Sequence, residues 1–225
     1  MDVGAITAII NRDLAALRLN ENIRAVLSSF EPKAKLFVIG GWLRDIAHNL
    51  RWTTALVSRD IDLVFQADEV PAVLSDWERT AFGGYTKCVG GTTMDIWRLE
   101  DTWTFKQKYF SPSFENLLKS VSFTVDAIAF EIGGDLTGDK ALRDIEAKTL
   151  ALNCDLYLDK LGSLQAFRAA KMSRKYGYVI SEEAKASLRN HLRQDELRAC
   201  IEREFENKEF VDKWSLEVAT LLECV

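Results

Sequence analysis

The chain has 225 residues, 48% of them hydrophobic, with a formal net charge of −5 and an isoelectric point near 5.3. This is enough for one sizeable core, or for a domain with an appendage. The acidic balance argues against indiscriminate nucleic-acid binding but leaves room for a local basic groove. The cysteines form no C-x-x-C pair, which predicts reduced thiols and neither a zinc site nor a disulfide framework. With no signal peptide and no run of membrane-spanning length, we expect a cytoplasmic protein.

The first elements expected in chain order are a helical region and a strand. Apolar side chains recur at roughly helical spacing from residue 3 to residue 29, which predicts a helical region that serves as packing surface. Glu31 and Pro32 end this pattern, because proline cannot continue a helix. The short apolar run from Leu36 to Ile39 then predicts the first strand.

Two glycines, Gly40 and Gly41, follow this strand directly. A Gly-Gly turn lets backbone N–H groups approach a phosphate closely. Arg44 and Asp45 come next on a predicted helix, whose N-terminus also favours negative charge. Taken alone, a pair of glycines usually marks only a turn. We do not assign His48, which follows closely after this turn, to catalysis.

A second apolar run carries Asp60 and Asp62, separated by one residue. Alternate side chains of a strand point the same way, so these two carboxylates are expected on one face and Ile61 on the other. Neighbouring like charges repel, and a divalent cation such as Mg²⁺ or Mn²⁺, shared with substrate phosphates, would neutralise them. Arg59 could offset the carboxylates, touch a phosphate, or be a solvated edge residue, and the sequence leaves these readings open.

The next stretch predicts a surface helix and then a glycine-bounded hairpin. Residues 68–80 suit a helix with a buried side formed by Val70, Val73, Leu74 and Trp77. Residues 82–98 predict two short strands bracketed by glycine turns, the second of which contains Asp95 between apolar neighbours. An acid in such a position is costly to bury unpaired, and a metal shared with Asp60 and Asp62 would partner it. The alternative is an edge-strand aspartate facing water, and we favour the site reading.

For the remainder of the chain, we expect a loop at 99–110, a short helix at 114–119, and a helical C-terminal part after residue 153. Arg168, Lys171 and Arg174 recur at three- and four-residue spacing, so they share one helix face. From Leu164 to Arg198 there are eight basic and four acidic residues, a local basic excess that could bind a triphosphate or an RNA backbone. Ordinary amphipathic-helix charge explains the later residues equally well, whereas we favour function for Arg168 and Lys171.

The order of strand, GG, helix with RD, and then D-I-D resembles the signature of the DNA polymerase β-like nucleotidyltransferases. The closest form is that of bacterial poly(A) polymerases and class II CCA-adding enzymes, GG-x-x-RD followed by D-x-D. The resemblance implies an α+β head with a mixed β-sheet flanked by helices (residues 1–153) and a C-terminal helical neck (154–225). It also implies nucleotide-binding roles, which fall on Gly40, Gly41, Arg44, Asp45, Arg98, Asp126, Arg168 and Lys171.

Two departures from the family pattern bear on the substrate. The family's Arg-Arg-Asp before F-T-I-N-A is replaced by Ser120, Val121 and Ser122, and Asp126 stands where asparagine is usual. Asp126 either compensates for the missing residues or only caps the following turn. The base-reading E-D-x-x-R of CCA-adding enzymes is replaced by Leu161, Gly162 and Gln165, so no protein template for C and A is expected.

We therefore expect a nucleotidyltransferase that uses an NTP, with Mg²⁺ (or Mn²⁺) held by Asp60, Asp62 and Asp95 as catalytic carboxylates. Three hypotheses stay open. The acceptor is an RNA 3′ end, such as that of a tRNA. Alternatively it is a protein side chain, a small molecule, or a tRNA attacked by a toxin-like activity. The third hypothesis is a non-catalytic nucleotide- or RNA-binding module, which the three retained acids argue against. No membrane partner is expected, and the oligomeric state cannot be read.

Overall fold

A computed structural model describes residues 1–30, 34–58 and 60–223. The chain forms two compact units: Met1–Val121 with Val125–Arg143, and Ser122–Thr124 with Asp144–Val225. The last crossing from the first unit to the second lies between Arg143 and Asp144. The domain boundary predicted near residue 153 stays a prediction. Within the described ranges, no helix is long and apolar enough to cross a bilayer. Glu31, Pro32 and Arg59, for which the sequence made predictions, lie outside the described residues.

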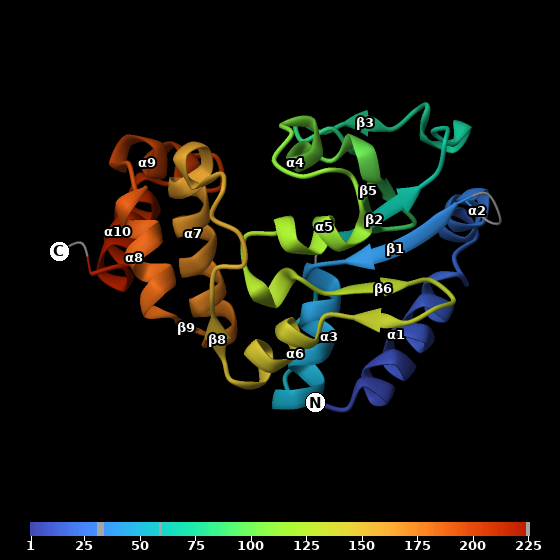
Figure 1. Ribbon diagram of the computed structural model, residues 1–225, viewed down its shortest axis with the longest axis horizontal. Helices are drawn as coiled ribbons and strands as arrows, with labels where there is room; N and C mark the ends of the chain where they lie inside the picture. Colours follow the sequence, from blue (N-terminus) through green and yellow to red (C-terminus); the bar gives the residue numbers. More distant parts are fainter. Residues whose placement is uncertain (31–33, 59, 224–225) are drawn as a thin grey trace. The chain divides into compact units, whose positions relative to one another are not determined.

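The first unit is built on a mixed sheet, as predicted. Among the described residues it has seven strands in the order β3-β4-β5-β2-β1-β6-β7 (Figure 1). β2 and β5 are parallel, and the other neighbours are antiparallel. The strands are β1 (Lys35–Ile39), β2 (Asp60–Gln66), β3 (Glu78–Arg79), β4 (Tyr85–Val89), β5 (Thr92–Arg98), β6 (Ala129–Glu131) and β7 (Leu136–Thr137).

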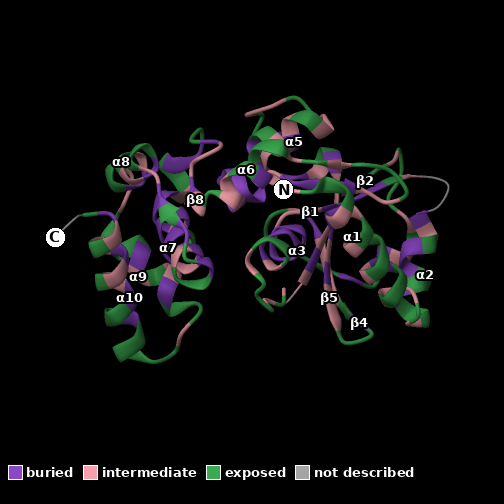
Figure 2. Ribbon diagram, turned by 90° about the horizontal axis from the view of Figure 1, so that it is seen from below, coloured by how far each residue is buried: buried purple, intermediate pink, exposed green. Residues whose placement is uncertain are grey.

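Helices pack around this sheet, and α3, which follows the glycine turn, is buried along most of its first two turns (Figure 2). The helices of this part of the chain are α1 (Val3–Leu17), α2 (Glu21–Phe30), α3 (Gly41–Trp52), α4 (Trp103–Lys106), α5 (Phe114–Ser120) and α6 (Asp139–Glu146). The short helix predicted at 114–119 is confirmed as α5. The loop predicted at 99–110 is in part helical, because α4 forms there.

The helical region predicted over residues 3–29 is confirmed, and the structure divides it into two helices, α1 and α2. The Asn20 side chain accepts hydrogen bonds from the backbone N–H groups of Asn22 and Ile23 at 3.0 and 3.4 Å, which starts a new helix. The periodicity could not show this break, since both helices bury apolar residues at the same spacing, including Ile10 in α1 and Val26 in α2.

The surface helix predicted over residues 68–80 is wrong. Only a 3-10 turn forms at Ala72–Leu74, and Glu78–Arg79 pairs with β4 as strand β3. Proline at position 71 restricts the backbone before the turn, and sheet pairing then outweighs helix propensity. Of the expected buried side, Leu74 and Trp77 are buried, whereas Val70 is exposed.

One face of the sheet is covered by the segment that follows β5. Phe37 of β1 stacks on Phe114 of α5, with ring centroids 3.9 Å apart. Val64 of β2 belongs to a buried cluster with Leu99, Phe105 and Leu117. Phe37 and Val64 are partners in the β1–β2 register, so they lie on the same face. Asp62 and Asp60 of β2 lie on this same face, two and four residues before Val64.

The second unit is mostly helical, as predicted for the C-terminal part. Its helices are α7 (Leu158–Tyr176), α8 (Glu182–Asn190), α9 (Gln194–Glu202) and α10 (Lys208–Leu221), beside the parallel strands β8 (Thr149–Leu150) and β9 (Val179–Ile180). Phe167 of α7 meets Trp214 of α10 edge to face at 5.5 Å. Cys88, Cys154 and Cys200 are free thiols, as expected; Cys224 lies outside the described residues.

Candidate active site

The three aspartates singled out in the sequence lie on two neighbouring parallel strands. Asp62 of β2 is the direct register partner of Asp95 of β5, and Asp60 pairs with Thr93 in the same ladder. Residues paired in this way point to the same face of a sheet. In β2 the aspartates are half-buried while Ile61 and Leu63 are buried, so the predicted alternation is confirmed. The strands therefore bring the three acids to one end of one face.

The surroundings of Asp95 make its negative charge unfavourable. Burial is the largest cause of a raised pKa for this carboxyl, and the nearby charge of Asp60 raises the pKa further. A hydrogen bond from the side chain of Thr86, its neighbour on β4, opposes the shift. The other carboxylate oxygen, Oδ1, is buried without a hydrogen-bond partner. Thr86 was missed by the sequence analysis, although the alternation in β4 would have placed it beside Asp95.

These features bear on whether a metal ion fits. Within the described part of the chain, no three His, Cys, Asp or Glu side chains already form a group that could hold a metal ion. The strand register nevertheless places Asp62 beside Asp95, and both the unpartnered Oδ1 and the repulsion from Asp60 would be relieved by a cation. The donor set consists of carboxylate oxygens, which suits a hard divalent ion such as Mg²⁺.

The glycine turn lies next to these carboxylates. Gly40 follows Ile39, which is the register partner of Asp62, and a Cβ on Gly40 would lie 3.7 Å from Oδ2 of Asp62. Gly40 has φ +68°, a backbone conformation that residues other than glycine rarely adopt. Helix α3 begins at Gly41, so its N-terminus opens at the carboxylates. The glycines and the aspartates, predicted to form two halves of one site, are neighbours in space.

Arg44 and Asp45 are buried beneath this turn. Arg44 forms a buried ion pair with Asp126, and its Nε lies 3.8 Å from Oδ1 of Asp45. Asp45 also accepts a 2.9 Å hydrogen bond from the hydroxyl of Ser58. The sequence placed Arg44 and Asp126 on the nucleotide but gave no sign of their pairing, because 82 positions separate them.

Arg98 does not share the face of the strand that carries the carboxylates. In the β2–β5 register Arg98 is three positions from Asp95, which places it on the other face of the strand, and its Nε lies 3.0 Å from Oδ2 of Asp101. His48 is buried, and its Nδ1 is 3.0 Å from the hydroxyl of Thr54. The exclusion of His48 from catalysis and the nucleotide-binding role of Arg98 both stay predictions.

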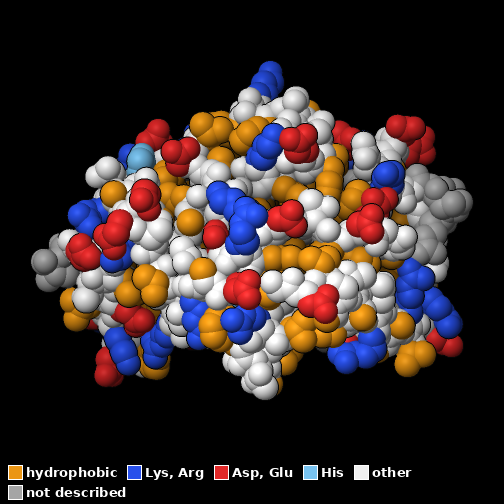
Figure 3. Space-filling view, turned by 60° about the horizontal axis from the view of Figure 1, so that its bottom comes forward, with side chains coloured by type: hydrophobic (Ala, Val, Ile, Leu, Met, Phe, Trp, Pro, Cys, Tyr) orange, Lys and Arg blue, Asp and Glu red, His pale blue; other side chains and the backbone are white. Residues whose placement is uncertain are grey.

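The basic residues predicted to bind phosphate in the second unit are largely engaged there. The Lys171 ammonium donates to both carboxylate oxygens of Glu204 at 2.6 Å. Arg168 is exposed, and its charge opposes the rise in the pKa of Tyr157, which is caused chiefly by burial. Further ion pairs join Arg174 to Glu217, Lys185 to Glu182 and Glu223, Arg193 to Glu196, and Arg198 to Glu202 and Asp212. On the face shown in Figure 3, acidic and basic side chains are interspersed.

The positions that would carry a base-reading pattern are packed into the helical unit. A Cβ on Gly162 would come within 2.6 Å of the backbone oxygen and Cβ of His191, so this glycine allows α7 to approach the turn after α8. Gln165 is 2% exposed. The residue types at these positions predicted that no base-reading template is present. The close contact with His191 leaves no room for a longer side chain at position 162.

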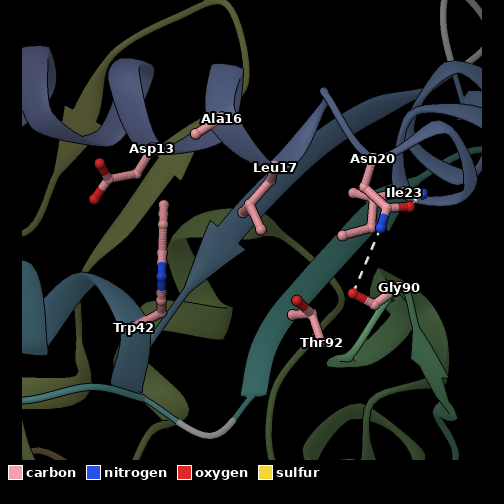
Figure 4. A pocket seen from close by; sticks show the side chains of 8 residues that line it. All are labelled: Asp13, Ala16, Leu17, Asn20, Ile23, Trp42, Gly90 and Thr92. Atoms are coloured by element: carbon pink, nitrogen blue, oxygen red, sulfur yellow. Dashed lines mark hydrogen bonds between the residues drawn. The ribbon is translucent and has the colours of Figure 1, made fainter.

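A groove of about 370 Å³ also opens in the first unit (Figure 4). It is bounded by Trp42, which follows the glycine turn, and by Thr92, which begins β5. The view shows the Trp42 ring edge-on, between Asp13 on one side and Leu17 on the other. The remaining lining residues are Ala16, Asn20, Ile23 and Gly90. None of the three site carboxylates lines this groove.

No protein-family model matches the sequence, and no curated protein gives a significant match. Solved structures do match. The complex of a CCA-adding enzyme with CTP gives a TM-score of 0.64 at 17% identity, over 100% of this chain and 55% of that one. The Thermotoga maritima CCA-adding enzyme complexed with tRNA gives 0.62 at 17% identity, over 99% and 54%. A tRNA-processing enzyme in an apo form gives 0.62 at 15% identity, over 95% and 57%.

The chain therefore has the fold that CCA-adding enzymes show over the matched part of their length, as its motifs predicted. More particularly, it corresponds to the head and neck of CCA-adding enzymes. It spans about half the length of those proteins.

Proposed function

We propose that this protein is a metal-dependent nucleotidyltransferase that transfers NMP from an NTP to an acceptor hydroxyl, with an RNA 3′ end as the first candidate acceptor. The observation that carries the proposal is the register of β2 and β5, which sets Asp62 beside Asp95 next to the glycine turn. Relatives in fold have been solved with CTP, with ATP and with tRNA.

In the proposed reaction the acceptor oxygen attacks the α-phosphorus, a new P–O bond forms, and the bond to the β-phosphate breaks as pyrophosphate leaves. Asp60, Asp62 and Asp95 would hold Mg²⁺, which when bound supplies charge stabilisation for the attacking and leaving oxygens. The backbone N–H groups at Gly40 and Gly41 would receive the β- and γ-phosphates. The carboxylates also offer acceptors for the hydroxyl proton. Positioning and charge neutralisation would account for most of the acceleration.

A different acceptor, either a protein side chain or a small molecule, is the second candidate. Two observations favour it over RNA: Gly162 is packed against His191, and the basic side chains of the helical unit are paired with acids. Both reduce what the described residues offer to a base or to an RNA backbone. Arg168 and Lys171 remain the residues proposed to assist phosphate binding.

A transfer assay tests the proposal. The protein is incubated with Mg²⁺, each α-labelled NTP in turn and total bacterial RNA, and then RNA, protein and small molecules are resolved separately. Label in RNA supports the first acceptor, and label in protein or in a small product supports the second. Nucleotide binding without any transfer would favour the non-catalytic module instead.

The matched variants are Asp60→Ala with Asp62→Ala, and Asp68→Ala with Asp76→Ala as a control. Both remove two negative charges from the first unit, but Asp68 and Asp76 are exposed and lie outside the site. We expect transfer to fall at least about a hundredfold in the first double variant and to stay unchanged in the second. Both variants should keep the circular dichroism of the parent. Full activity in the Asp60/Asp62 variant would sink the mechanism.

A further inference from the structure

Outside the three carboxylates, Arg44 and Asp126 are two buried charged residues of the first unit that contact each other. Arg44 is 9% exposed and Asp126 is 7% exposed, and they form a direct ion pair. Burying either charge alone is costly, so such a pair persists only where both partners stay in place. The pair joins the first turns of α3 to the segment that leads into β6.

The guanidinium of Arg44 lies directly beneath the glycine turn. A Cβ on Gly41 would come within 3.4 Å of one of its terminal nitrogens. The backbone N–H of Gly40 donates to the carbonyl of Ile128 at 3.0 Å, two residues beyond Asp126. The turn is therefore tied to the segment at 126–128 twice, once through the backbone and once through the buried ion pair.

The neighbouring side chain ties the same turn to the catalytic strand. Asp45 is 2% exposed and accepts a 2.9 Å hydrogen bond from Ser58, two residues before Asp60. Arg44 thus faces two carboxylates, those of Asp45 and Asp126. Only about a tenth of the Arg44 side chain is open to solvent, so little of its guanidinium is available to a phosphate.

We propose that Arg44 and Asp126 are positioning residues whose buried ion pair holds the Gly40–Gly41 turn in the conformation that receives the nucleotide phosphates, so that Arg44 acts through the turn and does not contact the nucleotide. This inference rests on the proposed function and names how its phosphate site is kept in shape. It replaces the expectation, drawn from the motif, that Arg44 binds phosphate directly.

A double-mutant cycle separates the two roles, with Mg²⁺·ATP binding as the readout. If the ion pair shapes the turn, Asp126→Ala weakens binding about tenfold, Arg44→Gln does the same, and the double variant is no weaker than Arg44→Gln alone. If Arg44 were a phosphate ligand held back by Asp126, Asp126→Ala would free it and tighten binding. The sign of the Asp126→Ala effect therefore decides, and unchanged or tighter binding overturns the proposal.

Two further variants guard against a trivial loss of stability. Leu27→Ala removes a buried side chain of α2 that is 1% exposed, and it should leave Mg²⁺·ATP affinity unchanged while lowering stability. Asp126→Asn keeps an oxygen that can accept from Arg44, so it should retain most of the affinity that Asp126→Ala loses. Equal losses in Leu27→Ala and Asp126→Ala would overturn the proposal.

Hydrogen exchange gives a readout that needs no nucleotide. Amides of residues 40–44 should exchange faster in Asp126→Ala than in the parent, with Asp126→Asn intermediate between the two; if the alanine variant does not fold, the smaller increase in Asp126→Asn is the readout. Parental exchange rates at the turn in the folded variant would refute the positioning role. If the parent binds no Mg²⁺·ATP, the proposed function fails, and the exchange rates alone still decide whether the ion pair shapes the turn.

Discussion

The hydroxyl of Thr86 donates to the carboxylate of Asp95 across the antiparallel pairing of β4 and β5. It is the single stabilising influence among the causes that set the pKa of Asp95, and it is outweighed by burial and by the charge of Asp60. Asp95 is therefore costly to ionise in the folded protein.

The raised pKa of Asp95 makes stability depend on pH in a defined direction. The folded state holds the Asp95 proton more tightly than the unfolded chain, whose pKa lies near the ordinary value of 3.8. Stability is therefore fully present below that value and is lost as pH rises through the higher pKa of the folded state. We expect Asp95→Asn, without divalent ions, to be more stable than the parent above this window, with the difference vanishing toward pH 3.5.

Thermal unfolding of the two proteins from pH 3.5 to pH 7.5 measures that difference directly. Thr86→Val provides the companion test, since losing the donor raises the pKa of Asp95 further and should increase the cost of ionisation in the parent background. A gap between Asp95→Asn and the parent that is the same at every pH would contradict the assignment.

Magnesium should stabilise the protein through the same carboxylates. A ligand that binds only the folded state contributes about 2.7 kcal/mol when its concentration is about a hundred times its Kd. We expect Mg²⁺ to raise the unfolding temperature of the parent and of Asp68→Ala with Asp76→Ala, but not of Asp60→Ala with Asp62→Ala. Sodium chloride at matched ionic strength controls for screening. A shift of equal size in both double variants would place the cation elsewhere.

Gly162→Ala should lower stability, although an alanine in place of a helical glycine ordinarily gains roughly 0.5–1 kcal/mol. The new methyl group would meet the backbone of His191 at 2.6 Å, and overpacking of this kind costs about 1–3 kcal/mol. Gly4→Ala in α1 is the control, because its methyl group would meet only the side chain of Asp2, at 3.3 Å. Chemical denaturation of both variants measures whether each substitution raises or lowers the free energy of unfolding. A Gly162→Ala variant more stable than the parent would show that α7 can move aside.

Glu204→Gln tests whether Lys171 serves the nucleotide. The glutamate takes both short hydrogen bonds from the ammonium, and the pair is about a third exposed on each side, so its loss should change stability by less than about 1 kcal/mol. If Lys171 assists phosphate binding, releasing it should tighten Mg²⁺·ATP binding by about two- to fivefold. Lys171→Ala should then weaken binding. Identical affinities in all three proteins would make this lysine purely structural.

The parts of the site that the sequence predicted follow from local rules. Strand alternation places Asp60 and Asp62 on one face from their spacing alone, and a glycine pair after a strand indicates a turn. The pairing of Asp62 with Asp95 needed one further step, since the order of the strands decides which acids meet. The resemblance to the nucleotidyltransferase motifs supplied that step, and the β2–β5 register confirms that Asp62 and Asp95 are neighbours.

The parts that were missed depend on contacts between distant positions. No spacing rule links Arg44 to Asp126. None links Lys171 to Glu204 either, because Glu204 is 33 positions further along the chain, after helices α8 and α9. The basic excess counted from residue 164 to residue 198 likewise stopped short of Glu204, Asp212 and Glu217, which pair with that stretch. Local propensity also gave a helix at residues 68–80, where pairing with β4 prevails.

Residues 122–124 belong to the helical unit, although the chain on both sides of them belongs to the sheet unit. Thr124 donates its backbone N–H to Ala151 at 3.0 Å, and Asn153 donates to Ser122 at 2.8 Å. A fragment that ended after residue 143 would carry Phe123, a fully buried residue, without Leu152, with which it forms a β-bridge. No single truncation therefore separates one unit from all residues of the other, and a study of the sheet unit in isolation should replace residues 122–124 or keep the whole chain.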